Sequence, residues 1–409
     1  MDFDLRPIIP DEFLAFSRSA VAGFGEHAKD EELEEERPLF NFERSIAAFD
    51  GDRIVGTGET FTFQLTVPGH RQIPAGGVSW ITVQPTHRRR GILNSMMTRI
   101  LDDVQEREEA VAILWASESI IYGRYGYGTA TTEMRFTLDS AAAKYAFSPQ
   151  HGGQVEMFTR EEAAAILPAI YEKARILQPG AITRSDAYWD YSLQRDPERW
   201  WDGAGPRFFA VYRNDKGKMD GYIAYRIKNE WTNGVPNGEL RVMELVSCTP
   251  SARAALWAFV LQIDLIHHID ARCPVDEPLR WMLADSRRLR VIRYHDGLWV
   301  RPMDICATLR GRNYASEGRL VLEVHDRFRP DNNGSYELEA SADGAGCRRT
   351  TKEPDLQLEV ADLGASYLGG TTFSSLARAG RVHECTAGAL ARADLLFAGE
   401  RAPSCQTDF

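Results

Sequence analysis

Residues 78–91 read VSWITVQPTHRRRG, and residues 92–104 continue as ILNSMMTRILDDV. The first six residues are rich in β-branched and aromatic side chains, which predicts a strand. The apolar residues after Gly91 recur at the spacing of one helix face, which predicts an amphipathic helix from Ile92 onward. The stretch therefore predicts a strand, a turn rich in arginine that ends in glycine, and a helix.

The turn at Arg88–Gly91 suits a phosphate group. The first N–H groups of a helix have no partner within the helix, and the helix dipole is positive at that end. Gly91 lets the backbone come close to a ligand, and the arginines add positive charge. We therefore expect a pyrophosphate here. The alternative is an ordinary strand–helix–strand unit whose basic turn binds nothing.

Two motifs follow one another along this part of the chain. Arg88-x-x-Gly91 is followed, after the predicted helix and a predicted strand at 110–116, by Tyr122-x-x-x-Gly126-Tyr127. In this order they resemble the acyl-CoA loop and the tyrosine motif of the GNAT N-acetyltransferases. The resemblance implies acetyl-CoA as co-substrate and no metal, with the tyrosine near the thioester sulfur.

Length and charge restrict the class of protein. A chain of 409 residues is too long for one core, so two or three domains are expected. The net charge of -11 argues against a general nucleic-acid-binding protein and is compatible with a cationic substrate.

The cysteines and the apolar segments point to an intracellular protein. The six cysteines show no C-x-x-C spacing, so neither a zinc site nor a disulfide framework is predicted. No signal peptide and no apolar run of about 18 residues is visible, so we expect a cytoplasmic protein without a membrane span. Release by another route stays open.

The order of predicted elements indicates an α+β chain of three domains. Expected strands at 45–50, 53–58 and 59–67 precede the opening stretch, and a strand at 133–138 follows it. Glycine and proline cluster near 149–153, which predicts a domain boundary. The domains are expected at 1–149, which carries the motifs that resemble a GNAT acetyl-CoA-binding domain, at 150–298 and at 299–409.

The second section repeats the order of the first without its cofactor turn. A predicted strand ending at Cys248 leads through Thr249-Pro250-Ser251 into a predicted helix, and no glycine lies between them. We therefore expect a GNAT-like domain that has lost cofactor binding. In the third section, predicted strands precede short helices, and the pattern from Asp362 to Gly370 resembles the sterol-carrier-protein-like domain.

These three modules together resemble the enhanced intracellular survival (Eis) family of N-acetyltransferases. The most specific matches are residues 82–91, residues 117–128 and the chain end Asp408-Phe409. The resemblance implies acetylation of several amines of aminoglycoside antibiotics, hence antibiotic resistance, and in some members of lysine side chains. It also implies a homo-oligomer, a hexamer in relatives.

The resemblance assigns roles by match of motif. Tyr122 would be the general acid and the α-carboxylate of Phe409 the general base. Ser119 and Ile120 stand where the family has a pair of small residues, which leaves the width of the pocket open. The residues expected to contact acetyl-CoA are Ile81, Thr82, Val83, Arg89, Arg90, Gly91, Ile92, Leu93, Asn94, Ser117 and Glu118.

Acidic residues are the expected contacts of a cationic acceptor. Asp30 lies in the dense acidic run 29–37, and Asp408 lies beside the chain end. The run has a simpler interpretation as a solvated helix face. Tyr122 and Phe409 likewise have simpler alternatives, a packed aromatic residue and a frayed terminus.

Two other functions remain open from the sequence. In the first, the same fold transfers the acetyl group to a protein lysine instead of an antibiotic. A different class of function is a lipid carrier or interaction module, suggested by the third section.

Overall fold

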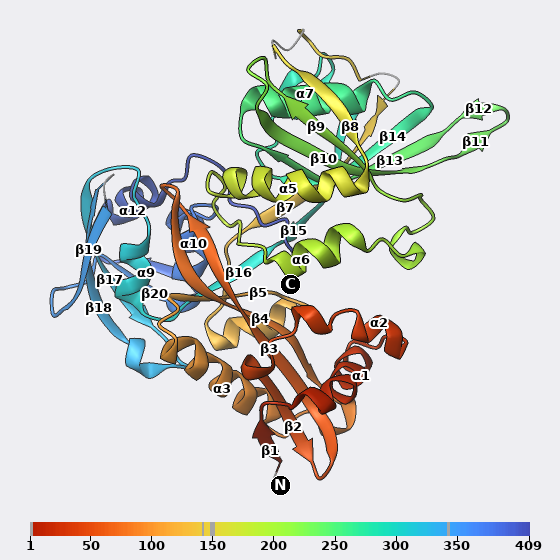
Figure 1. Ribbon diagram of the computed structural model, residues 1–409. Coiled ribbons are helices and arrows are strands. Elements are labelled where there is room, and N and C mark those ends of the chain that lie inside the picture. Colours follow the sequence, from red (N-terminus) through yellow and green to blue (C-terminus); the bar gives the residue numbers. More distant parts are fainter. Residues whose placement is uncertain (1–2, 141–142, 148–151, 342–343) are drawn as a thin grey trace. The chain divides into compact units, whose positions relative to one another are not determined.

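The structure is a computed structural model that describes residues 3–140, 143–147, 152–341 and 344–409. The chain forms two compact units: Thr132–Asp296 is one, and Met1–Thr131 together with Gly297–Phe409 is the other (Figure 1). Within the described ranges, no helix is long and apolar enough to cross a membrane.

The N-terminal part of the larger unit is a seven-stranded sheet. Its strands are β1 (Asp4–Arg6), β2 (Ser45–Asp50), β3 (Arg53–Val67), β4 (Arg71–Val83), β5 (Val111–Trp115), β6 (Gly128–Thr129) and β16 (Leu298–Pro302). The spatial order is β1-β2-β3-β4-β5-β16-β6. Neighbouring strands are antiparallel, except that β4 and β5 are parallel because α3 connects them.

Helices cover both faces of this sheet. Side chains of a strand alternate between faces, so Ile46 and Ala48 of β2 pack with α3, whereas Ala47 and Phe49 pack with α1. The face that α1 covers also carries a cluster of phenylalanine rings. The helices of this part are α1 (Phe13–Gly23), α2 (Asp30–Glu34), α3 (Ile92–Glu106) and α4 (Ser119–Tyr122).

The smaller unit is a second seven-stranded sheet. Its strands are β7 (Thr132–Asp139), β8 (Gln154–Phe158), β9 (Phe208–Arg213), β10 (Met219–Lys228), β13 (Gly238–Ser247), β14 (Ile266–Pro274) and β15 (Leu289–Asp296), in the order β15-β7-β14-β13-β10-β9-β8. Its helices are α5 (Arg160–Arg175), α6 (Asp186–Trp189), α7 (Pro250–Leu261) and α8 (Leu279–Met282). Alternate residues of β9 join the core under α7 and the core under α5, so these two helices cover opposite faces. A hairpin of β11 (Trp231–Thr232) and β12 (Val235–Pro236) extends away from this sheet (Figure 1).

The C-terminal part of the larger unit is a five-stranded sheet with helices on one face. The strands are β17 (Gly318–His325), β18 (Gly334–Ser341), β19 (Gly344–Thr350), β20 (Leu356–Glu359) and β21 (Val382–Glu384), in the order β19-β18-β17-β20-β21. The helices are α9 (Ile305–Gly311), α10 (Val360–Tyr367), α11 (Phe373–Arg378) and α12 (Ala389–Phe397). All four helices contribute to one apolar core.

The two sheets of the larger unit meet along α10. Every residue of α10 is buried. A Cβ on Gly364 would lie 2.2 Å from the carbonyl oxygen of Val300, and one on Gly128 would lie 1.8 Å from that of Ala361. The glycines therefore allow α10 to approach β16 and β6 closely.

The observed strands refine the expected ones. The residues expected to form strands at 53–58 and 59–67 form one continuous strand, β3, because the antiparallel pairing with β4 runs through both. A tight turn at Gly51 and Asp52 joins β2 to β3, and Asp50 pairs with Arg53 across it.

The compact units divide the chain at other points than the expected boundaries at 149 and 298. The strand expected at 133–138 is β7 and pairs in the second sheet, and β16 returns to the first sheet. Residues 149–151 of the expected first boundary lie outside the described residues. The three sequence modules therefore stay a proposal about sequence organisation.

Candidate active site

The end of β4 has an irregular backbone where the acyl-CoA arm is expected. Two residues of β4, Trp80 and Ile81, oppose a single residue of β3, which makes a β-bulge. Trp80 has a φ of 55°, and the Thr57 hydroxyl donates a hydrogen bond of 2.8 Å to its carbonyl oxygen. Pairing with β5 stops before residue 79, so residues 79–83 offer backbone groups on that side to an extended ligand.

The turn after β4 leaves the start of α3 accessible. Gly91 has a φ of 83°, and an added Cβ there would have no atom within 4 Å. The helix has no side-chain cap, and its first intrahelical bond, Ser95 N–H to Gly91 O, is 3.0 Å long. Arg88, Arg89 and Arg90 are exposed around it. The backbone N–H groups of 92–94 and this positive surface fit a pyrophosphate.

Tyr122 is the last residue of α4 and is 5% exposed. Burial raises the pKa of its phenol, and a hydrogen bond from Ser117 opposes part of that change. The ring packs in the same apolar cluster as Ile81, Val83 and Ile92. The phenol therefore keeps its proton at neutral pH and lies with residues expected to hold the cofactor.

Ser117 and Glu118 connect β5 to α4. Both are exposed, and the Glu118 carbonyl accepts a hydrogen bond of 3.1 Å from the N–H of Ile121. Glu118 is the residue before the helix and has extended backbone angles. These two residues thus lie at the end of the strand from which β4 has diverged.

The C-terminal segment lies on the first sheet. The ring of Phe409 is 4.9 Å from that of Phe63 and 6.3 Å from that of Phe61, both on β3. Upstream, Trp115 Nε1 at the end of β5 donates a hydrogen bond of 3.2 Å to the carbonyl oxygen of Thr407. Cys405 and Thr407 are buried. The segment is therefore packed, and it brings the chain end to the strands that carry the expected cofactor residues.

The acidic residues expected to bind the acceptor differ in their surroundings. Asp30, the first residue of α2, accepts a hydrogen bond of 2.9 Å from Arg18 Nε, and this ion pair lowers its pKa. Both partners are exposed, so the charge of Asp30 is partly balanced in the free protein. Asp408 is exposed beside the packed Phe409.

A buried carboxyl group on β3 was not identified from the sequence. Glu59 is 1% exposed and lies on the same face of β3 as Phe61 and Phe63. Its Oε1 accepts a hydrogen bond of 2.6 Å from the N–H of Asn41, and its Oε2 has no hydrogen-bond partner within the described residues. Burial raises its pKa to about 8. The sequence signal that could have identified this residue was the position of a glutamate, Glu59, within a run of residues with strand pattern.

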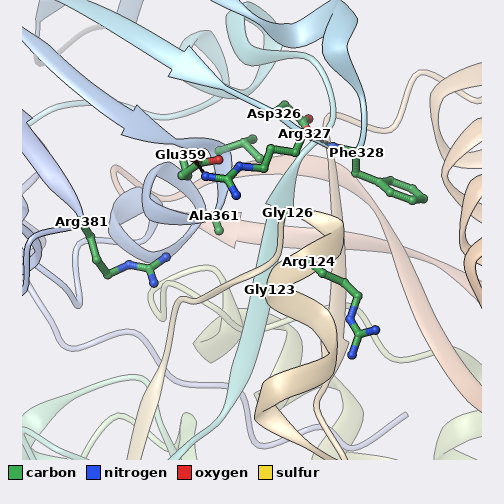
Figure 2. Close-up of a pocket in the computed structure, with 10 residues that line it drawn as sticks. Gly123, Arg124, Gly126, Asp326, Arg327, Phe328, Glu359, Ala361 and Arg381 are labelled. Carbon is green, nitrogen blue, oxygen red and sulfur yellow. Dashed lines mark hydrogen bonds and ion pairs between the residues drawn. The ribbon is translucent and has the colours of Figure 1, made fainter.

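One pocket of about 320 Å³ lies between the tyrosine turn and the C-terminal sheet (Figure 2). Its lining includes Gly123 and Gly126 but not Tyr122. Figure 2 shows Arg327 beside Glu359 on the side contributed by the C-terminal part. Arg327 Nη2 lies 3.0 Å from Glu359 Oε1. The charged lining makes the pocket unsuitable for a hydrocarbon chain.

The described part of the chain contains no group of three or more His, Cys, Asp or Glu side chains arranged to hold a metal ion.

Comparisons with known families match all three modules. Residues 4–130 match a family described as acetyltransferase (GNAT) domain, and residues 180–302 match a second family with the same description. Residues 305–406 match the sterol carrier protein domain. The three matches follow one another in the order expected from the sequence.

Individual relatives cover nearly the whole chain. An uncharacterized N-acetyltransferase from Streptomyces avermitilis is 38% identical, and the match covers 98% of each chain. The N-acetyltransferase Eis of Mycobacterium tuberculosis is 33% identical over 86% of this chain and 84% of its own length. The crystal structure of Eis1 from Mycobacterium abscessus superposes with a TM-score of 0.87 at 32% identity, covering 99% of this chain and all (100%) of that one.

Proposed function

We propose that this chain, which belongs to the Eis family of GNAT N-acetyltransferases, transfers the acetyl group of acetyl-CoA to amines of aminoglycosides or similar polyamines. The observation that carries the proposal is the convergence of three features on one sheet: the diverging end of β4, the accessible start of α3 and the packed chain end. The net charge of -11 favours a cationic acceptor.

Acetyl-CoA would bind along β4 and at the start of α3. The backbone of Ile81–Val83 would pair with the pantetheine arm, because β5 has already diverged there. The N–H groups and arginines of Arg89–Asn94 would hold the pyrophosphate, and Ser117 and Glu118 would line the slot. When bound, the thioester supplies an activated acetyl group.

The two proton transfers are assigned to two residues that lie far apart in the sequence. An attacking amine must lose a proton, and the α-carboxylate of Phe409 would accept it. An α-carboxyl has an ordinary pKa of about 3.5, so it acts as a base only when desolvated or assisted by water. Tyr122, whose pKa burial raises, would give its proton to the departing sulfur.

Several amines of one acceptor would be within reach if the acceptor binds in more than one orientation. Asp408 and Asp30 would attract its other ammonium groups. Binding of an ammonium group to Asp30 would replace part of the ion pair between Asp30 and Arg18. Because both side chains are exposed, this ion pair contributes little free energy and its loss would cost little.

The test is turnover of the purified chain with acetyl-CoA and a panel of amines, followed by release of free thiol. The panel contains kanamycin, spermidine and a lysine-containing peptide. Thiol release with kanamycin or spermidine supports the proposal, and absence of release with every amine contradicts it. Faster turnover of the peptide would reassign the acceptor to protein lysine.

The match of residues 305–406 to the sterol carrier protein domain favours lipid binding as a second candidate. The pocket in Figure 2 has a charged lining and would not be the site of such a lipid. We propose instead that this domain holds the C-terminal segment against the first sheet. Organic extraction of the purified protein, followed by mass spectrometry, would recover a stoichiometric lipid if the carrier function were correct.

We also propose a homo-oligomer, a hexamer by family resemblance. Light scattering at micromolar concentration would give a multiple of the monomer mass of 46.0 kDa. A single species at the monomer mass would contradict this.

A further inference from the structure

Two cysteines of the C-terminal part lie against each other. The Sγ atoms of Cys306, on α9, and Cys347, on β19, are 2.8 Å apart. Both are present as free thiols and are partly exposed. From this juxtaposition we propose that Cys306 and Cys347 are a site of reversible disulfide formation, oxidised by a low-molecular-weight disulfide.

The surroundings allow the bond to form from the native state. Cys347 lies on the edge strand of the five-stranded sheet, directly opposite Leu338 of β18. Both thiols pack at the border of the apolar core instead of inside it. A small rotation of the two side chains, without unfolding of either element, brings the sulfurs together for bond formation.

The chemistry proceeds by two exchange steps. Cys306 is the attacking group, because the hydrogen bond from the Cys347 thiol lowers its pKa. Burial and Asp304 oppose this change, whereas Arg310 and Arg349 act in the same direction as the hydrogen bond. Its thiolate attacks one sulfur of RS–SR, forms a mixed disulfide and releases one RS⁻. Cys347 then attacks the Cys306 sulfur, forms the internal disulfide and releases the second RS⁻. Two protein thiols and one RS–SR become one protein disulfide and two RSH.

The disulfide would link the edge strand β19 to α9, the helix that follows β16 of the first sheet in the chain. The chain passes from β16 directly to α9, and the Thr308 hydroxyl of α9 donates a hydrogen bond of 2.8 Å to the carbonyl oxygen of Ala110, just before β5. A link between cysteines separated by 41 positions restricts the unfolded chain. Oxidation therefore stabilises the larger unit, and a reducing thiol reverses the effect.

The experiment treats the full chain with oxidised glutathione and measures intact mass, cysteine-linked peptides and thermal unfolding. Formation of the internal disulfide should lower the mass of wild type by about 2 Da, the mass of the two thiol hydrogen atoms. Wild type should yield one peptide pair joined through Cys306 and Cys347, and its Tm should rise by about 5 °C or more. Dithiothreitol should restore the original mass and Tm.

Two variants provide the controls. Cys306→Ala should gain no internal disulfide and show no rise in Tm, whereas Cys385→Ala, which removes an exposed thiol elsewhere, should behave like wild type. Stable glutathione adducts on Cys306 or Cys347 without the internal link would overturn the proposal. The same mass loss in Cys306→Ala would also overturn it.

Discussion

The two seven-stranded sheets each contain a strand that leads through a turn into a helix, and the turns differ in what they do with the helix start. In the first sheet, Gly91 precedes α3 without any side-chain cap. In the second, the Thr249 hydroxyl accepts a hydrogen bond of 3.1 Å from the N–H of Ala252, and Pro250 supplies no N–H at all. One helix start is therefore available to an anion, and the other is satisfied internally. With a similar order of elements, only the first sheet leaves its helix start without a side-chain cap.

The two sheets also differ in that the C-terminus of the chain packs on the first sheet. Phe409 packs on β3 of the first sheet, beside the divergence of β4 and β5. We expect that adding one alanine after Phe409 lowers kcat by about 10²-fold or more, because the ring is retained while the carboxylate is displaced. The KM for acetyl-CoA should stay within about twofold of the wild-type value, because the added residue removes none of the expected contacts to the cofactor. Steady-state kinetics with saturating amine measure both quantities.

The control is the full-length chain with a tag at its other end. If the C-terminally extended enzyme turns over at the rate of this control, the carboxylate is not the base. Glu118 or a bound water would then be the next groups to examine.

Tyr122 tests whether the phenol acts on the departing sulfur. Tyr122→Phe keeps the buried ring in its apolar cluster and removes only the hydroxyl. We expect kcat to fall by about 10²-fold with little change in the KM for acetyl-CoA, because a proton donor is lost and a binding surface is not. Equal kcat values for the two enzymes would show that the proton comes from elsewhere.

A glycine in the hairpin turn between β9 and β10 of the smaller unit, Gly217, provides a matched control for Gly91. Gly91 and Gly217 have φ values of 83° and 76°, and an added Cβ at either has no atom within 4 Å. Gly91→Val and Gly217→Val should therefore cost similar backbone strain. Only the Gly91 variant should raise the KM for acetyl-CoA, by about 10-fold, because the strained turn no longer presents the helix start to the pyrophosphate. A similar rise in the Gly217 variant would mean that the effect is general destabilisation.

Local patterns predicted much of the first sheet. The β-branched run predicted the end of β4, and the apolar period predicted that α3 begins at Ile92. Such features depend on neighbours in sequence, so the sequence carries them. The family resemblance, and not the pattern, supplied the roles of Tyr122 and Phe409.

Features that depend on distant partners were not predicted. β16 is a short, fully buried strand, and nothing in its own five residues indicates that it pairs with β5 and β6. Glu59 was missed because the expected strand break between 58 and 59 placed it at a strand end. In the continuous strand its side chain points inward and lies beneath Asn41.

Buried carboxyl groups provide a further contrast between the sheets. Glu277 of the smaller unit is paired with Arg253 and accepts a hydrogen bond of 3.0 Å from Trp257 Nε1. Among the described residues, Glu59 has only the backbone N–H of Asn41. Glu277 therefore has a cationic partner, whereas Glu59 has none among its described contacts and burial raises its pKa.

This contrast predicts opposite signs for two matched substitutions. The pKa of Glu59 rises from an ordinary 4.5 to about 8 in the fold. The folded chain thus holds a proton that the unfolded chain releases, and wild type should lose stability as pH rises from 4.5 to about 8. At pH 8, Glu59→Gln should be more stable than wild type by about 4 kcal/mol, at about 1.4 kcal/mol for each pH unit between 4.5 and 8, with little difference near pH 4.5.

Glu277→Gln should be less stable than wild type at the same pH, because it leaves the Arg253 charge without its partner. Urea unfolding of the three proteins at several pH values measures these differences. A Glu59→Gln curve parallel to wild type at every pH would show that Glu59 is ionised with an ordinary pKa.

The smallest expected effect concerns the cap that closes the second helix start. Thr249→Ala removes the hydroxyl that accepts from Ala252 N–H and should lower the free energy of unfolding of the smaller unit by about 1 kcal/mol. The KM for acetyl-CoA should not change, because the loss of one cap supplies neither the glycine nor the arginines of the first turn. Calorimetric titration with acetyl-CoA should accordingly give the same single-site stoichiometry for the variant and wild type. A second site appearing in Thr249→Ala would mean that the cap alone separates a binding turn from a silent one.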